Sequence, residues 1–403
     1  MKMPVRNRVL MLLENNPFPQ DFRVNKEAHA LASRGYQVTV ICPGRNEQRW
    51  REKIDGIYVF RYPSPPTGNT FFNYFWECGY SWIATFLISL FVCFKPGFDI
   101  IHAANPPDTM VFIAAFYKLF GKLFIFDHHD LAPELYHVRF GNKNNKLIYR
   151  ILLWLEKISC RYADHVIVTN QSYKEMDLRR NRVSKERITI VRNGPNDFLP
   201  QIAPKAEPRH HEKTIILYAG TIGFQDGVEY LIRAVEFLVH SLDRNDLFCI
   251  LIGDGVALSA QKILAKQLNL SDFMSFRGQI DHKKVLKYLR SADICVAPEP
   301  SNPYNDRSTM IKIMEYMAAG KPTVCFDLPE NRFTARDAAL YACPNDDKDL
   351  ARKIEVLMNN AEKRKNTGEI GRLRIEKELA WFHQEKQLLE VYIKVSGCRE
   401  EKK

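Results

Sequence analysis

Three side chains in the C-terminal half of the chain could bind a phosphorylated ligand. Ser308, Lys312 and Glu315 are spaced at i, i+4 and i+7, so they share one stripe of any helix that contains them. An ammonium group suits phosphate, and a carboxylate can accept hydrogen bonds from ribose hydroxyls. The stripe therefore predicts a nucleoside diphosphate site. The alternative is an ordinary ion pair between Lys312 and Glu315 on the surface of an amphipathic helix.

The residues around this stripe predict a strand, a helix and a second strand. The apolar runs Ile294–Pro298 and Pro322–Phe326 are short enough to be buried strands. Between them, Ser308–Ala319 is rich in helix-forming residues, begins with polar residues that could cap a helix, and ends at Gly320. One face carries apolar residues at three- and four-residue spacing (Met310, Ile311, Met314, Met317 and Ala318). The helix N-terminus would add backbone N–H groups and a dipole that favour an anion.

The segment that contains the stripe resembles a known family signature. The run NDRSTMIKIMEYMAAGKPTVCFDLPENR at 305–332, followed by DAALYACPND at 337–346, is similar to the donor-binding signature of family 4 glycosyltransferases of the GT-B fold. The pattern is closest to the bacterial exopolysaccharide and cell-surface glycan branch. Glu315 fits the second Glu of the family's Glu-x7-Glu motif, and Arg307 stands in place of the first, so no role is carried over for that acid. The resemblance implies a nucleotide-sugar site formed by Ser308, Thr309, Lys312 and Glu315.

Length and composition indicate a two-domain protein of a reducing compartment. The chain has 403 residues, too many for one ordinary core, and 46% of them are hydrophobic. Its nine cysteines are scattered and odd in number and include no C-x-x-C pair, which argues against a disulfide framework. The first residues lack the pattern of a secretory signal peptide. We therefore expect a cytoplasmic protein.

The N-terminal half carries most of the positive charge. Residues 1–200 contain 27 Lys and Arg against 18 Asp and Glu, a net charge of +9, whereas the remainder carries +2. This asymmetry suggests an anionic partner, either a membrane surface or a phosphorylated lipid. Nucleic acid is the competing partner, but the sequence contains no helix-turn-helix, zinc-finger or RNP-like pattern, so we expect none.

The most apolar stretch, residues 70–94, has Glu77 as its only charge. It is long enough for a transmembrane helix, but Glu77 and Gly79 interrupt it and leave Tyr80–Phe94, which is short for a span. Three interpretations stay open: a buried helix beside the first sheet, as the family resemblance implies, a helix that dips into a membrane, and a true span. With the basic half, this stretch suggests peripheral attachment to the inner face of the cell membrane.

The first forty residues predict a strand, a helix and a second strand. Arg8–Leu13, a helix over about 22–33 and Gln37–Cys42 would start a doubly wound sheet. No G-x-G-x-x-G follows the first strand, which argues against a nicotinamide or flavin site. The run DFRVNKEA in this helix is similar to the same transferase branch. Arg23 would then approach phosphate or acceptor; the alternative is a charge on a helix face.

A polar cluster follows the apolar run Lys122–Phe126. The residues DHHDLAPE at 127–134 come at the carboxyl end of a predicted parallel strand, where open α/β sheets bind ligands. Adjacent residues on a loop rarely converge on one ion, and this spacing matches no zinc or iron pattern, so we expect no metal. The alternative to a ligand site is a structural cluster. The run also resembles the transferase branch, which implies that His129 faces the donor sugar and that Asp130 orients its ring.

The second half repeats the α/β rhythm after a Pro-rich segment, 196–212, that indicates a linker. After the predicted strand Thr214–Ala219 comes the turn Gly220-Thr221-Ile222-Gly223, whose glycines would let backbone amides approach a phosphate, although such turns are often only tight turns. Many relatives carry Arg and Lys at the positions of Thr221 and Asp226, so Lys312 is the expected source of positive charge. The resemblance also places the nucleobase against the backbone at Gly278.

Together these features predict two doubly wound Rossmann-like α/β domains facing across a cleft, the GT-B fold. Residues 1–200 would form the acceptor-side domain, 213–379 the nucleotide-sugar domain, and a helix in 380–403 would pack back on the first. The resemblance implies a retaining hexosyltransferase that moves a sugar from a nucleotide diphosphate sugar to a glycan or polyprenyl-linked acceptor in cell-surface polysaccharide synthesis, without metal or cofactor. The alternatives are a nucleotide-sugar epimerase of the same architecture and a non-catalytic scaffold.

Overall fold

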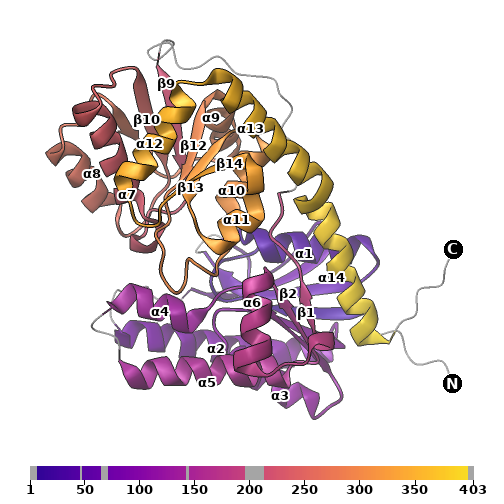
Figure 1. Cartoon of the computed structure of the whole chain (residues 1–403). Coiled ribbons are helices and arrows are strands. Elements are labelled where there is room, and N and C mark those ends of the chain that lie inside the picture. The colour runs from indigo at the N-terminus through magenta and orange to yellow at the C-terminus, as the bar shows by residue number, and fades with distance from the viewer. Residues whose placement is uncertain (1–6, 46–47, 65–70, 142–144, 196–212, 398–403) are drawn as a thin grey trace. The chain divides into compact units, whose positions relative to one another are not determined.

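The computed structural model describes residues 7–45, 48–64, 71–141, 145–195 and 213–397. The predicted linker, 196–212, lies outside the described residues. The chain divides into two compact units (Figure 1). The first unit comprises Met1–Asn193 and Gln384–Lys403, and the second unit comprises Gly194–His383.

The first unit is built on an eight-stranded sheet in the order β3-β4-β2-β1-β5-β6-β7-β8. All neighbours are parallel except the β3–β4 pair. The central strands β1 and β5 are buried along almost their whole length because both of their faces are covered. The strands are β1 (Arg8–Leu12), β2 (Gln37–Gly44), β3 (Arg51–Ile54), β4 (Ile57–Pro63), β5 (Ile100–Ala104), β6 (Leu123–His128), β7 (His165–Val168) and β8 (Ile188–Ile190).

Crossover direction assigns the helices of this unit to the two faces of the sheet. The connections from β4 to β5, from β5 to β6 and from β6 to β7 all move across the sheet in one direction, whereas the connection from β1 to β2 moves in the other. Because such crossovers are right-handed, α2, α3 and α5 cover one face and α1 covers the opposite face. The helices are α1 (Phe22–Ser33), α2 (Phe71–Phe94), α3 (Met110–Lys118), α4 (Ala132–Phe140), α5 (Lys146–Tyr162) and α6 (Gln171–Met176).

The second unit has a six-stranded parallel sheet in the order β11-β10-β9-β12-β13-β14. The chain moves from β9 to one side, through β10 and β11, and then returns to β12 on the other side. The boundary between β9 and β12 is therefore the topological switch point, where open α/β sheets bind ligands. The strands are β9 (Thr214–Ala219), β10 (Leu247–Ile252), β11 (Met274–Phe276), β12 (Ile294–Ala297), β13 (Thr323–Phe326) and β14 (Ala339–Ala342).

Helices cover this second sheet, and a last helix leads back to the first unit. Asp346 caps α12 by accepting hydrogen bonds from the backbone N–H groups of Lys348 and Asp349. The helices are α7 (Val228–Glu236), α8 (Leu258–Gln267), α9 (His282–Ser291), α10 (Ile311–Ala318), α11 (Pro329–Ala335), α12 (Asp347–Met358), α13 (Ala361–Arg374) and α14 (Trp381–Ser396). In the first unit, Tyr392 of α14 is fully buried, and its hydroxyl lies 2.7 Å from His102 Nδ1.

The prediction of two doubly wound Rossmann-like domains is confirmed. The prediction of a helix that starts at Ser308 is wrong, because α10 begins at Ile311. Ser308 donates its hydroxyl hydrogen back to the carbonyl of Tyr304, 2.9 Å away, and so takes part in the preceding turn instead of capping the helix. Met310 occupies the N-cap position and makes no side-chain cap.

Candidate active site

Three glycines at the carboxyl ends of neighbouring strands lie close together in the candidate site of the second unit, and we call this set the glycine floor. Gly220 follows β9, Gly253 follows β10, and Gly278 comes two residues after β11. Gly253 donates its N–H to the carbonyl of Gly278 at 3.0 Å, and the N–H of Gly220 bonds to Ile252 at 3.0 Å. A Cβ on Gly253 would lie 1.7 Å from the carbonyl oxygen of Gly220. The backbones of Gly220 and Gly253 touch here because neither residue has a side chain. Through Gly253, the structure brings the predicted residues Gly220 and Gly278 near each other.

Lys312, in the first turn of α10, is held at the switch point by two buried side chains. Its Nζ forms an ion pair with the carboxylate of Glu299, which follows β12, and lies 2.9 Å from the hydroxyl of Tyr218 on β9. The Lys312 side chain is 11% exposed and that of Glu299 is 1% exposed. The second carboxylate oxygen of Glu299, Oε2, is buried without a hydrogen-bond partner among the described residues. Lys312 is thus the principal partner of this buried carboxylate.

The surroundings of Lys312 keep it charged. Burial alone lowers the pKa of a lysine, but the surrounding groups, Glu299 first among them, together outweigh burial here, so the pKa of Lys312 is raised well above its ordinary value. Asp226 adds to this effect from 3.8 Å. A Cβ on Gly220 would lie 2.9 Å from Cε of Lys312. Gly220 therefore leaves the space through which the lysine side chain reaches the end of β9.

The other predicted donor-binding residues of this unit surround the lysine in sequence and structure. Thr309 and Ser308 belong to the turn before α10, and the hydroxyl of Thr309 lies 3.4 Å from Glu330. Glu315 is partly buried on α10, one turn after Lys312. Thr221 is exposed, and the buried Gly223 donates its N–H to Asp226 at 3.0 Å. The predicted donor-binding residues near the switch point of the second sheet are therefore grouped around Lys312.

In the first unit, His129 follows β6 and is held by its neighbours. Its Nδ1 lies 3.2 Å from Oδ2 of Asp127, and its backbone N–H donates to the side chain of Asn105 at 2.8 Å. The ring is 16% exposed. Burial lowers the pKa of His129, but Asp127 and, to a smaller extent, Asp130 together outweigh burial and raise that pKa. Asp127 contacts the ring, and the backbone of Asp130 is held by Asn105. Asp130 also acts on the charge of His129, and its expected role in orienting the ring stays a prediction.

Arg23 is not placed to receive a phosphate. It is 5% exposed, and its guanidinium donates to both oxygens of Asp127 at 2.6 Å, to Asn193 at 2.7 Å and to the carbonyl of Val191 at 3.0 Å. Glu27 lies 3.3 Å from the same group. Protein acceptors therefore occupy the guanidinium, and the interpretation of Arg23 as a phosphate or acceptor contact is corrected. The arginine instead supports Asp127, and through it His129.

A second histidine, which is fully buried, extends this network. His102 lies 3.3 Å from Glu27 and 3.9 Å from Asp127. Burial lowers the pKa of His102, but Glu27 and Asp127 together raise it to about 9. Glu27, His102 and Asp127 are close enough to share a metal ion. However, Arg23 and the protonated His102 together already supply the positive charge that balances the two carboxylates.

His128, on the other face of β6, belongs to a separate buried cluster. Its Nδ1 lies 3.1 Å from Asp177, and Cys160 Sγ is 3.6 Å from the same carboxylate. Burial lowers the pKa of His128, but Asp177 and Glu156 raise it to about 10. Arg180 contributes a second cation by binding Glu156. His128 and Arg180 thus provide the positive charge that a metal ion would otherwise supply to Asp177 and Glu156.

Two family descriptions match nearly consecutive parts of the chain. Glycosyltransferase Family 4 matches residues 23–197, and Glycosyl transferases group 1 matches residues 201–374. The boundary between the two matches falls close to the boundary between the two units. The chain belongs to the family 4 glycosyltransferases of the GT-B fold.

Relatives of this glycosyltransferase share moderate identity over part of their length. An uncharacterized glycosyltransferase of Methanocaldococcus jannaschii is 26% identical over 179 residues, which is 42% of this chain and 44% of the relative. The O-antigen chain mannosyltransferase of Salmonella typhimurium is 24% identical over 222 residues, 55% of this chain and 56% of that protein. The chain thus spans about half the length of these curated relatives.

Solved structures show the same fold over nearly all of the given chain. Sucrose-phosphate synthase from Thermosynechococcus elongatus superposes with a TM-score of 0.80 at 20% identity, covering 98% of this chain and all of that one. Anabaena HepE in complex with UDP-glucose superposes with a TM-score of 0.69 at 13% identity, covering 95% of this chain and 98% of that one.

Several residues of the candidate site were not anticipated from the sequence of this glycosyltransferase. Tyr218 lies in an apolar run and Glu299 directly follows one, and only their position at strand ends could have marked them. Asp127 was noted as part of a polar run, but its contact with Arg23 joins residues 104 positions apart. Such pairs arise from tertiary packing and leave no local pattern in the sequence.

Proposed function

We propose that this protein is a retaining glycosyltransferase that moves a sugar from a nucleotide diphosphate sugar to a glycan or polyprenyl-linked acceptor in cell-surface polysaccharide synthesis. The observation that carries the proposal is the charged Lys312 at the switch point of the second sheet. It stands beside a glycine floor and at the start of a helix. An ammonium group, a helix N-terminus and exposed backbone together suit a diphosphate.

Each part of this site has a role in holding the donor. Lys312 and the N–H groups at the start of α10 would neutralise the diphosphate, and Glu315 would accept hydrogen bonds from the ribose hydroxyls. The backbone at Gly220, Thr221 and Gly223 would face the phosphates, and that at Gly278 would face the base. Ser308 and Thr309 would complete the phosphate side.

The chemistry follows from stabilising the leaving group. As the sugar–oxygen bond breaks, negative charge develops on the diphosphate, and the fixed cation and dipole are already in place to stabilise it. We propose a front-side displacement in which the departing phosphate oxygen takes the proton of the acceptor hydroxyl, so the new bond keeps the donor's configuration. His129, oriented by Asp127, would hydrogen-bond to the donor sugar during transfer. No metal is required by this scheme.

Relatives support the substrate classes. HepE has been solved in complex with UDP and with UDP-glucose, and the Salmonella relative is an O-antigen chain mannosyltransferase. These facts favour a nucleoside diphosphate donor and a surface-glycan acceptor for this chain as well. We also propose a cytoplasmic location with peripheral attachment to the membrane, because residues 1–200 carry a net charge of +9.

A panel of nucleotide sugars tests the proposal. With membrane extract as acceptor source, the proposed enzyme should release nucleoside diphosphate from one donor and transfer its sugar. Conversion of a donor to its epimer without acceptor would identify a nucleotide-sugar epimerase instead. Tight donor binding without any turnover would identify a non-catalytic scaffold.

A further inference from the structure

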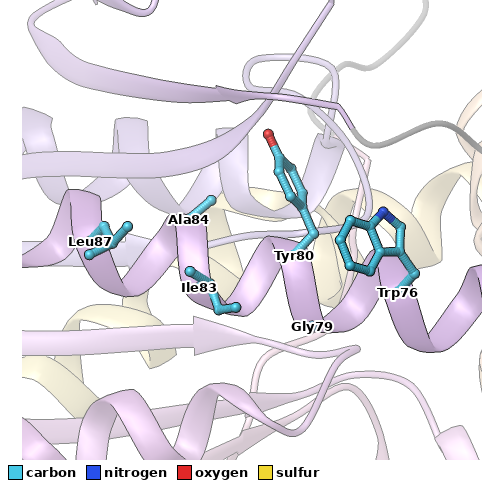
Figure 2. Close-up of a pocket in the computed structure, with 6 residues that line it drawn as sticks. All are labelled: Trp76, Gly79, Tyr80, Ile83, Ala84 and Leu87. Carbon is cyan, nitrogen blue, oxygen red and sulfur yellow. The ribbon is translucent and has the colours of Figure 1, made fainter.

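Helix α2 presents its bulky apolar side chains to the outside of the first unit. The exposed residues recur at helical spacing and are large: Trp76 is 66% exposed, Ile83 55%, Leu87 59%, Phe91 47% and Phe94 90%. Figure 2 shows Trp76, Ile83 and Leu87 as side chains along this helix, where with Gly79, Tyr80 and Ala84 they line a shallow apolar hollow of about 300 Å³.

The opposite face of α2, which packs inward, carries small and polar residues. Ser81, Thr85, Ser89 and Val92 are all buried. The hydroxyl of Ser89 lies 2.9 Å from that of Tyr117 on α3. In a water-exposed helix the apolar stripe faces the core and the polar stripe faces solvent. This helix has the reverse arrangement, so its outer face requires an apolar environment of its own.

The neighbouring helices extend the same face. Phe86 of α2 packs against Phe116 of α3 at 5.3 Å between ring centres, and Phe112 of α3 contacts Trp154 of α5 at 6.2 Å. These three helices cover one side of the sheet and lie in the lower part of Figure 1. Each exposes large apolar residues, which on α5 recur at i, i+4 and i+7. The exposed apolar residues of α3, of the turn that follows it and of α5 are Phe112, Leu119, Phe120, Leu147, Ile151 and Trp154. These residues and the exposed stripe of α2 together form the surface that we call the apolar face.

The charges in and beside these helices are predominantly positive. The sequences of α2, α3 and α5 contain only two acidic residues, Glu77 and Glu156, and Glu156 is buried against Arg180. Exposed cations accompany the apolar residues: Arg150 adjoins Ile151 on α5, and Lys95 directly follows Phe94. A large apolar surface with a basic border matches an anionic lipid bilayer better than a protein partner of balanced charge.

Helix α2 is also the one helix of the described residues that is long and apolar enough to cross a membrane, and 22% of the segment Trp76–Phe94 is buried. A span would have to withdraw Ser81, Thr85 and Ser89 from their packing within the unit. Lying in the plane of the interface keeps these contacts and still covers the exposed stripe.

We propose that the apolar face is a docking surface for an anionic lipid bilayer, with α2 in the plane of the interface. The inference rests on the proposed function in one respect: a polyprenyl-linked acceptor would have its reactive end at that interface. The residues of the apolar face would attach the protein to the bilayer surface, and α2 would not cross the membrane.

Flotation with vesicles tests the surface. Wild-type protein should float with vesicles of phosphatidylcholine and phosphatidylglycerol, and less with phosphatidylcholine alone. Ile83→Glu combined with Leu87→Glu should lower the partition coefficient at least about tenfold, because two apolar side chains lose their burial in lipid. The matched control is Ile263→Glu on α8, an isoleucine that is 58% exposed on the second unit, and it should bind like wild type. Circular dichroism establishes that each variant is folded.

Other outcomes would overturn the proposal. Equal binding of the double variant and wild type would show that the face does not contact lipid. A wild-type dimer that dissociates in the double variant, without vesicle binding, would assign the face to a second copy of the chain. Resistance of wild type to alkaline carbonate extraction would indicate a span. Wild type that turns over nucleotide sugar without binding vesicles refutes the surface alone; wild type that binds vesicles without any turnover refutes the proposed function alone.

Discussion

Removal of the Lys312 ammonium should destabilise the second unit strongly. Lys312→Met leaves the carboxylate of Glu299, which is 1% exposed, without its cation and with Oε2 already lacking a hydrogen bond among the described residues. Breaking a buried ion pair from one side costs about 3–5 kcal/mol, because the remaining charge is uncompensated. Glu299→Gln should cost less, about 1–3 kcal/mol, since the lysine keeps the hydroxyl of Tyr218 and the charge of Asp226.

The double variant separates this account from a simple loss of packing. Lys312→Met with Glu299→Gln removes both charges, so its free energy of unfolding should exceed the value expected from adding the two single losses by about 1–3 kcal/mol. Urea denaturation followed by circular dichroism measures all four proteins, with Lys262→Met on the surface of α8 as a control for the substitution. Additive losses, or a Lys312→Met protein within about 1 kcal/mol of wild type, would refute the coupling.

Three further predictions concern the donor, the reaction and pH. Glu315→Ala should weaken donor binding roughly 10- to 150-fold by removing charge-assisted hydrogen bonds to the ribose, and calorimetry with unchanged affinity would contradict this assignment. His129→Ala should lower kcat about 100-fold and leave nucleotide affinity nearly unchanged; a structural role would instead lower Tm and spare turnover. The pKa of His102 is about 9 in the folded protein, so the stability that its charge contributes should be complete below about pH 6.5 and lost as the pH rises through 9. Comparison of wild type with His102→Gln by thermal melting across this range measures that loss, and parallel curves would contradict it.

Elements with a strong local signal were predicted well. The apolar run of β9 was assigned with the bounds that the structure shows, Thr214–Ala219. The helix over 22–33 also matches α1, which Asp21 caps through a hydrogen bond from Val24. In each case the residues that determine where the strand or helix begins and ends are adjacent in sequence, so the local sequence pattern predicts its bounds.

A local signal was also missed. The hairpin of β3 and β4 was not predicted, although Asp55 and Gly56 form its turn with φ angles of 47° and 89°. An Asp-Gly pair between alternating apolar and polar residues is a recognised hairpin signal, because both turn residues need positive φ.

The interactions that define the site could not be predicted from local patterns. Lys312 was selected for its spacing from Glu315, but its structural partners are Glu299 and Tyr218, and Tyr218 is 94 positions away. Likewise, the family resemblance suggested a ligand contact for Arg23, and the sequence could not correct this because an exposed and a buried arginine look the same in it. Its burial against Asp127 depends on how α1 packs on the first sheet. Tertiary packing, and not sequence spacing, decides which charge remains for a substrate.

Transfer of a labelled sugar tests the central claim most directly. Wild-type protein and Lys312→Ala are incubated with a panel of nucleotide sugars labelled in the sugar and with membrane extract as the source of acceptor. The account predicts that wild type moves label from one donor into an acceptor product with release of nucleoside diphosphate, and that folded Lys312→Ala does so far more slowly. Label that remains in the nucleotide sugar with every donor, or equal transfer by folded Lys312→Ala, would contradict it.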